Sequence, residues 1–409
     1  MIYPQLYAVT QHFDETAEPD VRAAVRREIA AADLQKRISP GQTVAVAVGS
    51  RGIRNLVDIV AETVAALKDL GLSPFLMPAM GSHGGATSDG QAAILSDLGL
   101  IEDTVGAPVR SGMDVVSVGH IGNGAEVFMA RDAWEADHLV VVNRIKPHTA
   151  FRGEVESGLC KMLTVGCGKH QGALNMHKYD LGQSIVPAAE LILSKMQVLF
   201  GLAILENAAE QTMRIRGTDS DNFVSTDREN LLIAKKLLPR IPTDDLDILI
   251  VDQMGKNISG AGMDPNVIGM WRRDGGPRTP DYRTLVMLDL TSQSHGNAVG
   301  IGMVDLTTKQ VLEKVSLKAT YTNALTTGIW SSVRLPIALD TDREVVETAL
   351  SRIPVPDTVR LARVRNTLEL ETLWVSKAVA EDLKKRADLS IDPSPLTFQF
   401  DPNDRLRPF

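Results

Sequence analysis

The chain has 409 residues, of which 44% are hydrophobic and 23% are charged, and its formal net charge is −8. A chain of this length exceeds the size at which one hydrophobic core stops growing, so two domains are expected. The negative charge argues against a nucleic-acid partner, because phosphate binding needs a clustered basic surface.

The sequence gives no sign of a secreted or membrane protein. Its two cysteines, Cys160 and Cys167, lack CxxC spacing, so neither a disulfide scaffold nor a thiol-based metal site is indicated. The first fifteen residues have no basic region followed by an apolar core, so no signal peptide is expected. The apolar stretch 186–205 contains Glu190 and Lys195, which predicts a helix running into a strand and not a membrane span. A cytoplasmic protein is expected.

Strand-like and helix-like segments alternate over the first 240 residues. Residues 43–49 form a continuous β-branched and alanine run, which predicts a buried parallel strand. Apolar spacing predicts a helix over 55–70 that stops at Gly71. Further strands are expected at 73–81, 114–119, 125–130 and 138–143, with a helix at 91–98 capped by Thr87 or Ser88. This alternation predicts an α/β layered domain.

A second α/β domain is expected over 241–409, after a first domain of residues 1–240. Its strand signals lie at 246–252, 284–290 and 358–364, its helical patterns at 307–326 and 343–353, and a glycine-rich loop at 255–264. The proline-rich end, 390–409, is expected to wrap back over the body. The predicted fold class is therefore α/β, with two α/β domains of mostly parallel strands and the active site in the cleft between them.

Polar residues directly after predicted strands are the candidates for chemistry, because ligands in open α/β sheets bind at the carboxyl ends of strands. Three of the eight histidines, His83, His148 and His177, lie in such loops. Gly81 and the pair Gly84-Gly85 would let the backbone around His83 approach a ligand closely.

Two lysines, Lys161 and Lys169, lie in a glycine-punctuated run between His148 and His177. These residue types suit metal binding, general acid–base catalysis or a covalent lysine adduct. From residue types alone, a metal- or cofactor-assisted proton chemistry is expected, and the choice among these chemistries stays open.

The order of these motifs resembles the nickel-dependent lactate racemase family. Gly81-Ser82-His83, with Thr87 four residues after the histidine, is similar to the family's Gly-Thr-His segment, and Lys146-Pro147-His148 resembles its Glu-Pro-His. The resemblance implies that His83 and His148 are the two catalytic proton-transfer residues.

The resemblance also implies a cofactor. Gly158-Leu159-Cys160-Lys161 resembles the stretch that ends in the family's cofactor-bearing lysine, and the separation of Lys161 from His177 equals that between this lysine and the nickel ligand. Lys161 would then carry a nickel-pincer nucleotide (pyridinium-3,5-bisthiocarboxylic acid mononucleotide with nickel), and His177 would bind the metal. Lys169 is the alternative, because three extra residues separate His148 from Lys161 compared with the racemase.

Three further residues follow from the resemblance. Arg51 stands where the family has an arginine that holds the cofactor phosphate or the substrate, and Arg54 is the competing choice. Gln253 and Lys256 reproduce a Gln-x-x-Lys pair that faces the substrate carboxylate and belongs to the catalytic set.

The implied activity is that of an isomerase, a racemase or epimerase that inverts the α-carbon of a 2-hydroxy acid by proton-coupled hydride transfer. The expected partners are a small-molecule 2-hydroxy acid (lactate, malate, 2-hydroxyglutarate and aldonic acids all stay open) and the enzymes that synthesise the cofactor. A homo-oligomer is left open. Glu154 and Glu156 would either support a histidine or lysine or lie in a solvated loop, and Arg152, Arg214 and Arg216 could favour a second carboxylate on the substrate.

Two other classes compete with the racemase. The first is a zinc-dependent hydrolase or lyase that uses the same histidines, for which zinc would want three protein ligands in a compact site. The second is a non-catalytic protein that keeps the fold, and the three intact histidines argue against it.

Overall fold

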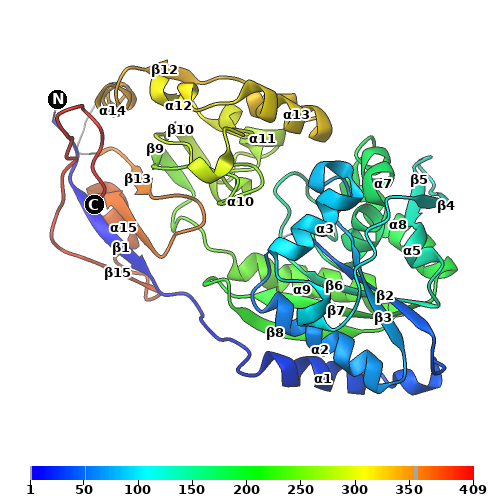
Figure 1. Ribbon diagram of the computed structural model, residues 1–409. Coiled ribbons are helices and arrows are strands. Elements are labelled where there is room, and N and C mark those ends of the chain that lie inside the picture. The colour runs from blue at the N-terminus through cyan, green and yellow to red at the C-terminus, as the bar shows by residue number, and fades with distance from the viewer. Residues whose placement is uncertain (1, 51, 354–357) are drawn as a thin grey trace. The chain divides into compact units, whose positions relative to one another are not determined.

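A computed structural model describes residues 2–50, 52–353 and 358–409. The chain divides into two compact units: Asp14–Leu238, the central unit, and Met1–Phe13 together with Pro239–Phe409, the terminal unit (Figure 1). Within the described part of the chain, no helix is long and apolar enough to cross a membrane.

The central unit is built on a five-stranded sheet in the order β3-β2-β6-β7-β8. Its first four strands run parallel, and β8 pairs with β7 in the antiparallel sense. The strands are β2 (Thr43–Val48), β3 (Ser73–Pro78), β6 (His138–Arg144), β7 (Val198–Glu206) and β8 (Thr212–Thr218). The runs expected at 43–49, 73–81 and 138–143 are thus neighbouring parallel strands, and they are continuously apolar because both faces of the sheet are covered.

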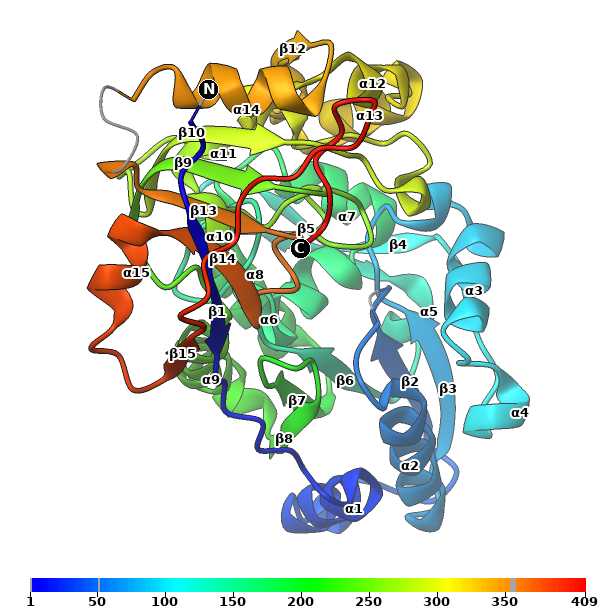
Figure 2. The ribbon, with the colours of Figure 1, turned by 90° about the vertical axis from the view of Figure 1, so that its left-hand side faces the viewer.

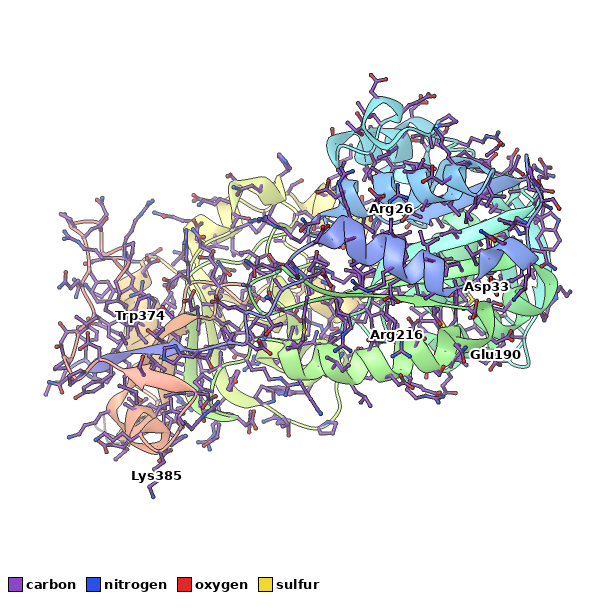
Figure 3. All side chains as sticks on the ribbon, turned by 90° about the horizontal axis from the view of Figure 1, so that it is seen from below. Arg26, Asp33, Glu190, Arg216, Trp374 and Lys385 are labelled. Atoms are coloured by element: carbon purple, nitrogen blue, oxygen red, sulfur yellow. The ribbon has the colours of Figure 1, made fainter. Side chains whose placement is uncertain are left out.

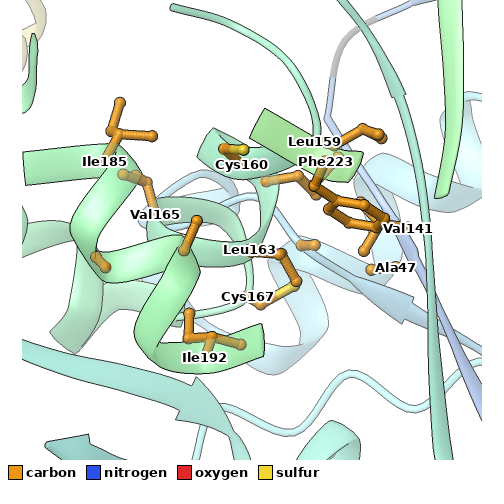
Figure 4. Close-up of a cluster of buried hydrophobic side chains, with 14 of the residues drawn as sticks. Ala47, Val141, Leu159, Cys160, Leu163, Val165, Cys167, Ile185, Ile192 and Phe223 are labelled. Atoms are coloured by element: carbon orange, nitrogen blue, oxygen red, sulfur yellow. The ribbon is translucent and has the colours of Figure 1, made fainter. Parts of the chain in front are cut away.

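Helices cover both faces of this sheet and form two separate cores. In one core, α1 and α2 pack against the residues of β2, β6 and β7 that point to one face of the sheet. In the other core, α8, α9 and the segment 159–167 pack against the opposite face (Figure 4). Both cysteines are buried in the second core and are free thiols. The helices are α1 (Val21–Ala31), α2 (Leu56–Asp69), α3 (Ser88–Asp97), α4 (Glu102–Val105), α5 (Arg131–Trp134), α6 (Leu159–Lys161), α7 (Lys169–Met176), α8 (Leu181–Lys195) and α9 (Phe223–Leu237).

The strands expected at 114–119 and 125–130 do not join the parallel sheet. They are β4 (Val115–His120) and β5 (Glu126–Ala130), which form an antiparallel two-stranded ribbon of their own. The intervening turn is short, and a parallel connection would have needed a crossover of a dozen or more residues.

A π-helical turn, η3 (Met162–Gly166), follows α6 directly.

The terminal unit contains an eight-stranded sheet in the order β12-β11-β10-β9-β13-β14-β1-β15. The strands from β12 to β13 run parallel, and the remaining pairings are antiparallel. The elements are β1 (Leu6–Gln11), β9 (Asp245–Val251), α10 (Pro265–Ile268), α11 (Trp271–Asp274), β10 (Asp281–Met287), β11 (Leu306–Thr308), α12 (Lys309–Glu313), α13 (Leu317–Thr327), β12 (Ile337–Leu339), α14 (Asp342–Leu350), β13 (Leu361–Val364), β14 (Thr372–Ser376), α15 (Lys377–Leu383) and β15 (Leu389–Ile391).

Two sequence-based expectations need correction here. Residues 1–13 were expected in the first domain, but β1 lies between β14 and β15 in the sheet of the terminal unit (Figure 2). The single helix expected over 307–326 is instead the strand β11 followed by α12 and α13. Thr307 and Thr308 are β-branched and fully buried beside β10, so sheet packing outweighs the helical spacing there.

The proline-rich end wraps back over its own unit, as expected. Leu396 exchanges two backbone hydrogen bonds with Leu6, at 2.9 and 2.7 Å. Trp374 lies on β14 (Figure 3). The ring of Phe409 lies 5.0 Å from the Trp374 ring, and the Arg363 guanidinium is 4.5 Å from the same Phe409 ring. The last residues therefore complete the packing of the sheet.

Candidate active site

Two of the predicted residues follow neighbouring strands in the central unit. His83 lies in the loop after β3 and His148 in the loop after β6, and β2 pairs with both strands in the parallel sense. Ser50, in the loop after β2, hydrogen-bonds through its hydroxyl to Nδ1 of His83. Sequence reasoning did not single out Ser50, although its position directly after a strand is the same signal that found the histidines.

The glycines around His83 serve the packing of its loop. A Cβ on Gly81 would lie 3.2 Å from the Cβ of Ala173 in α7, and one on Gly84 would lie 2.5 Å from the backbone carbon of Gly90 in α3. Both residues also have positive φ, at 59° and 66°. Their conformational freedom lets the loop pack against these helices, and the close approach to a ligand expected at this loop stays a prediction.

The loop that carries His148 is held at its base and along its length. Lys146 and Ser157 form an antiparallel bridge, with backbone hydrogen bonds of 3.0 and 3.2 Å. The backbone N–H of His148 donates to Oε2 of Glu156 at 2.7 Å. The imidazole ring lies 4.4 Å from the ring of Phe151. This loop therefore presents the His148 ring in one orientation.

Glu156 is a supporting residue of this loop and Glu154 is not. The Glu156 side chain is fully buried, and it forms ion pairs with Lys235 at 2.7 Å and with Arg152 at 3.5 Å. Glu154 is half exposed and pairs with Arg228 at the surface. The sequence allowed these two acids either to support a histidine or to lie in a solvated loop. Glu156 supports His148, and Glu154 lies in the solvated part of the loop.

Lys161 ends α6 and meets His148. Its amine nitrogen lies 2.6 Å from Nε2 of the His148 ring. The start of α6 is fixed by Asp227 of α9, which accepts hydrogen bonds from the backbone N–H groups of Leu159 (2.9 Å) and Cys160 (2.8 Å). Burial raises the pKa of Asp227 to about 6, and these hydrogen bonds lower it in part. Asp227 thus fixes the start of the short helix that carries Lys161.

The hydrogen bonds of the His148 ring favour an uncharged Lys161 amine. The backbone N–H of Ala150 donates to Nδ1 of His148 at 3.1 Å, so Nδ1 is an acceptor. A neutral imidazole then carries its proton on Nε2, which must donate to the Lys161 nitrogen. Only an amine with a lone pair can accept this bond. Such an amine is a nucleophile toward acyl groups.

His177 follows α7 and has the tautomer that suits a metal ligand. Its Nδ1 lies 2.6 Å from the carbonyl oxygen of Ala173, one turn earlier, to which it donates. The neutral ring then has its lone pair on Nε2. The His177 residue is exposed at the surface, but its ring is partly desolvated, which lowers its pKa, and the charge of Lys161, when protonated, lowers that pKa further.

Lys169, the alternative cofactor lysine, points into the protein. Its side chain is fully buried, and its amine donates to the carbonyl oxygen of Pro78 at 2.7 Å and to Oε1 of Gln91 at 3.3 Å. Burial lowers its pKa to about 8. The structure therefore favours Lys161 for any covalent role.

The two arginine candidates follow β2 in the sequence. Arg51 falls outside the described residues. Arg54 donates its backbone N–H to Oε1 of Glu206 at 2.7 Å, and Glu206, at the end of β7, also pairs with Arg144 at the end of β6. The Arg54 residue is exposed, and only its backbone is bound by Glu206 at the end of β7.

The three arginines considered for a second substrate carboxylate differ in their surroundings. Arg152 donates to the carbonyl oxygen of His148 at 2.8 Å and pairs with Glu156, so it supports the His148 loop. Arg214 and Arg216 lie on the edge strand β8, where Arg216 pairs with Glu229 at 3.4 Å (Figure 3).

Gln253 and Lys256 belong to the terminal unit, in the loop after β9. Gln253 donates its backbone N–H to the carbonyl oxygen of Arg365 at 2.9 Å. Lys256 donates its amine to the carbonyl oxygen of Gly260 at 2.5 Å and its backbone N–H to Ser294 Oγ at 2.9 Å. Both residues therefore lie at the carboxyl end of a parallel strand of their own sheet.

Metal-ligand geometry bears on the zinc alternative. Across residues 2–50, 52–353 and 358–409, no three His, Cys, Asp or Glu side chains come together as a metal-binding group. A catalytic zinc site uses three such ligands. The zinc alternative therefore has no support from the described side chains, whereas a metal held mainly by an organic group needs only His177.

Comparison with known proteins finds similarity to one family. Residues 6–184 match the family model of the lactate racemase N-terminal domain. The lactate racemase apoprotein from Thermoanaerobacterium thermosaccharolyticum is similar with a TM-score of 0.54 and 13% identity, over 88% of this chain and 94% of that chain. A protein from Thermotoga maritima is similar with a TM-score of 0.51 and 13% identity, over 81% of this chain and 86% of that chain. No curated protein matches the chain by sequence.

The layered α/β fold is thus one that a lactate racemase also has, and the family match lies within residues 6–184. The chain is therefore similar to the lactate racemase family over these residues and shares the fold of the lactate racemase apoprotein. The resemblance and the α/β fold class that the motifs indicated are thereby confirmed.

Proposed function

We propose that the protein is a cytoplasmic 2-hydroxyacid racemase or epimerase that carries a nickel-pincer nucleotide on Lys161. The observation that carries the proposal is the contact between Lys161 and His148, on a loop of the same sheet edge as His83. A lysine amine must be uncharged to form an amide or thioamide link, and the hydrogen bonds of His148 favour that state.

The residues present fit this group. Lys161 offers a nucleophilic amine, and His177 offers one imidazole nitrogen with its tautomer fixed by Ala173. Imidazole nitrogen is a ligand that suits nickel, so His177 would hold the metal. When bound, the group would supply a hydride acceptor, as cofactors supply the hard chemistry in other enzymes.

The protein's part in the reaction is to move one proton on each side of the substrate. His83 is held by Ser50 at Nδ1, so Nε2 is the atom that would exchange a proton with the substrate hydroxyl. His148 would serve the opposite face through its Nε2 atom. Inversion at a carbon needs an acid or base on each side, which two histidines provide.

The substrate carboxylate would be bound by cations and an amide. We assign this role to Lys256 and Gln253, with Arg51 as a second cation, because positioning of the substrate supplies much of the rate. The substrate is a small 2-hydroxy acid, and the enzymes that synthesise the cofactor would act on the chain before it is active.

The first experiment measures intact mass and nickel content of protein produced together with the cofactor-synthesising enzymes. The wild type is expected to carry a covalent adduct and nickel, and Lys161→Ala is expected to carry neither. His177→Ala should keep the adduct and bind less nickel. Lys178→Ala, which removes an exposed lysine beside His177, is the matched control and should behave as the wild type.

A loaded protein would then be given single enantiomers of 2-hydroxy acids, and inversion would be followed by chiral chromatography. An adduct that persists in Lys161→Ala would disprove the attachment site. Absence of adduct and nickel from every sample would reject the proposed function as a whole.

A further inference from the structure

A buried polar pair lies beneath the loop that carries His83. Lys169 and Gln91 are both fully buried, and the Lys169 amine donates to Gln91 Oε1 at 3.3 Å and to the carbonyl oxygen of Pro78 at 2.7 Å. The Gln91 amide nitrogen donates to the carbonyl oxygens of Gly81 at 2.8 Å and of His83 at 3.3 Å. Three backbone carbonyls of one loop segment are thus satisfied from within the protein.

The burial of Lys169 lowers the stability of the folded protein, so stability by itself does not account for this residue. A lysine that loses all contact with water is costly, because its charged form is strongly hydrated. The backbone of Lys169 also has a φ of +53°, which a residue with a Cβ adopts at a cost. An apolar side chain of similar length would avoid the first cost, so the amine must contribute something that packing does not.

The amine fixes which way the Gln91 amide faces. Because Oε1 accepts from Lys169, the NH₂ group must point at the carbonyl oxygens of Gly81 and His83. Without the Lys169 donor, Oε1 would stay buried and lose this hydrogen bond, so the Gln91 side chain would be held only by its bonds to the two carbonyl oxygens. The Lys169–Gln91 hydrogen bond therefore supports the contact between Gln91 and the His83 loop.

We infer that Lys169 and Gln91 are positioning residues that hold His83 in the place from which it exchanges a proton. The inference rests on the proposed function only in the role that it gives to His83. The ring of His83 is held at Nδ1 by Ser50, and its backbone is held by Gln91, so the two contacts together fix the imidazole.

The test measures the His83 ring itself. Protein without cofactor or substrate is labelled with ¹³C at the histidine Cε1 atoms, and the His83 signal is assigned with His83→Gln. In Lys169→Met and in Gln91→Glu the His83 signal is expected to move by more than its linewidth or to split, with a changed titration midpoint. The signals of His177 and His138 should stay in place.

Two further variants distinguish an effect on the position of His83 from a general loss of stability. Thr63→Val is the matched control, because it removes a fully buried hydroxyl whose hydrogen bond, to Ile59 at 2.7 Å, stays within α2. It should lower the melting temperature without moving the His83 signal. Gln91→Glu keeps the size of the side chain and an acceptor for Lys169, so it decides the question if Lys169→Met does not fold.

An unchanged His83 signal in folded Lys169→Met and Gln91→Glu would overturn the inference, whatever their melting temperatures. Because these spectra need no bound group, they are independent of the mass and nickel measurement that tests the proposed function. In a loaded enzyme that inverts a 2-hydroxy acid, the same variants should lower kcat by roughly 10- to 100-fold with little change in KM.

Discussion

The buried amine of Lys169 should make the stability of the central unit depend on pH in the alkaline range. Burial lowers its pKa from 10.5 to about 8 in the folded protein. Between these values the unfolded chain binds a proton at this lysine and the folded protein does not. Stability therefore rises with pH across this interval, and the penalty for a charged buried lysine is fully present below pH 8.

The size of this effect follows from the shift in pKa. One pKa unit corresponds to about 1.4 kcal/mol, so the shift in Lys169 corresponds to a penalty of about 3 kcal/mol at neutral pH. Between pH 7 and pH 10, the free energy of unfolding should rise by roughly 2.5 kcal/mol through this residue. Lys169→Met removes the titrating group, so its free energy of unfolding should lack this rise.

Thiol labelling gives a probe that reports on the central unit alone. Cys160 and Cys167 are the two cysteines of the chain, and both are buried there. Urea unfolding at several pH values, followed by a short pulse of a thiol reagent, would give the free energy of unfolding for wild type and variant. Burial raises the pKa of Cys167 to about 12, which lowers stability as pH rises, and the charge of Lys169 lowers that pKa to a smaller extent, so most of this effect is common to both proteins.

The difference between the two curves is therefore the quantity that matters. A wild-type curve that runs parallel to that of Lys169→Met from pH 7 to pH 10 would refute the reasoning, since it would mean that the amine is as well hydrated in the folded protein as in the unfolded chain.

Three other predictions concern the supports of the lysine and of His148. Gly158→Ala would place a Cβ 2.4 Å from Oδ1 of Asp227. Urea unfolding should show that this substitution costs about 1 to 3 kcal/mol of stability. Because the clash displaces the start of α6, an acylating reagent should also modify Lys161 more slowly, as measured by peptide mass spectrometry. Because the folded pKa of Asp227 is raised from 3.8 to about 6, its contribution makes the protein less stable as pH rises through this range. The wild type should thus lose about 2 kcal/mol more than Asp227→Asn between pH 4 and pH 7, and equal pH slopes would contradict this. Glu156→Gln leaves two cations facing an uncharged buried amide and should cost about 2 kcal/mol, whereas Glu154→Gln, on the same loop but half exposed, should change stability by less than about 0.5 kcal/mol.

The sequence predicted the strands of the central sheet because their signal is local. Residues 43–49 and 138–143 are continuously apolar and bounded by turns, and a parallel strand covered on both faces produces that pattern. The pairing of β1 with β14 joins segments more than 360 residues apart, as in Leu6 with Ser376. No local pattern in residues 6–11 indicates which sheet the strand will join.

The candidate site was predictable to a similar extent. His83 and His148 were proposed because they lie in loops that follow strands, and Lys161 because its motif resembles that of a family. The supporting residues Asp227 and Gln91 act through contacts distant in sequence, and their types alone are those of ordinary helix residues. Burial distinguishes them, and burial of a polar side chain is decided by tertiary packing.

The position of β1 has a consequence for how the chain is made. Since β1 is synthesised first and its partners β14 and β15 last, the strand must wait for almost the whole chain before it can pair. The central unit lies between these events and contains its own sheet and cores, so it can fold during synthesis. A fragment cut at residue 240 would carry β1 as an unpaired apolar strand prone to aggregation, and a fragment that begins at Asp14 would not.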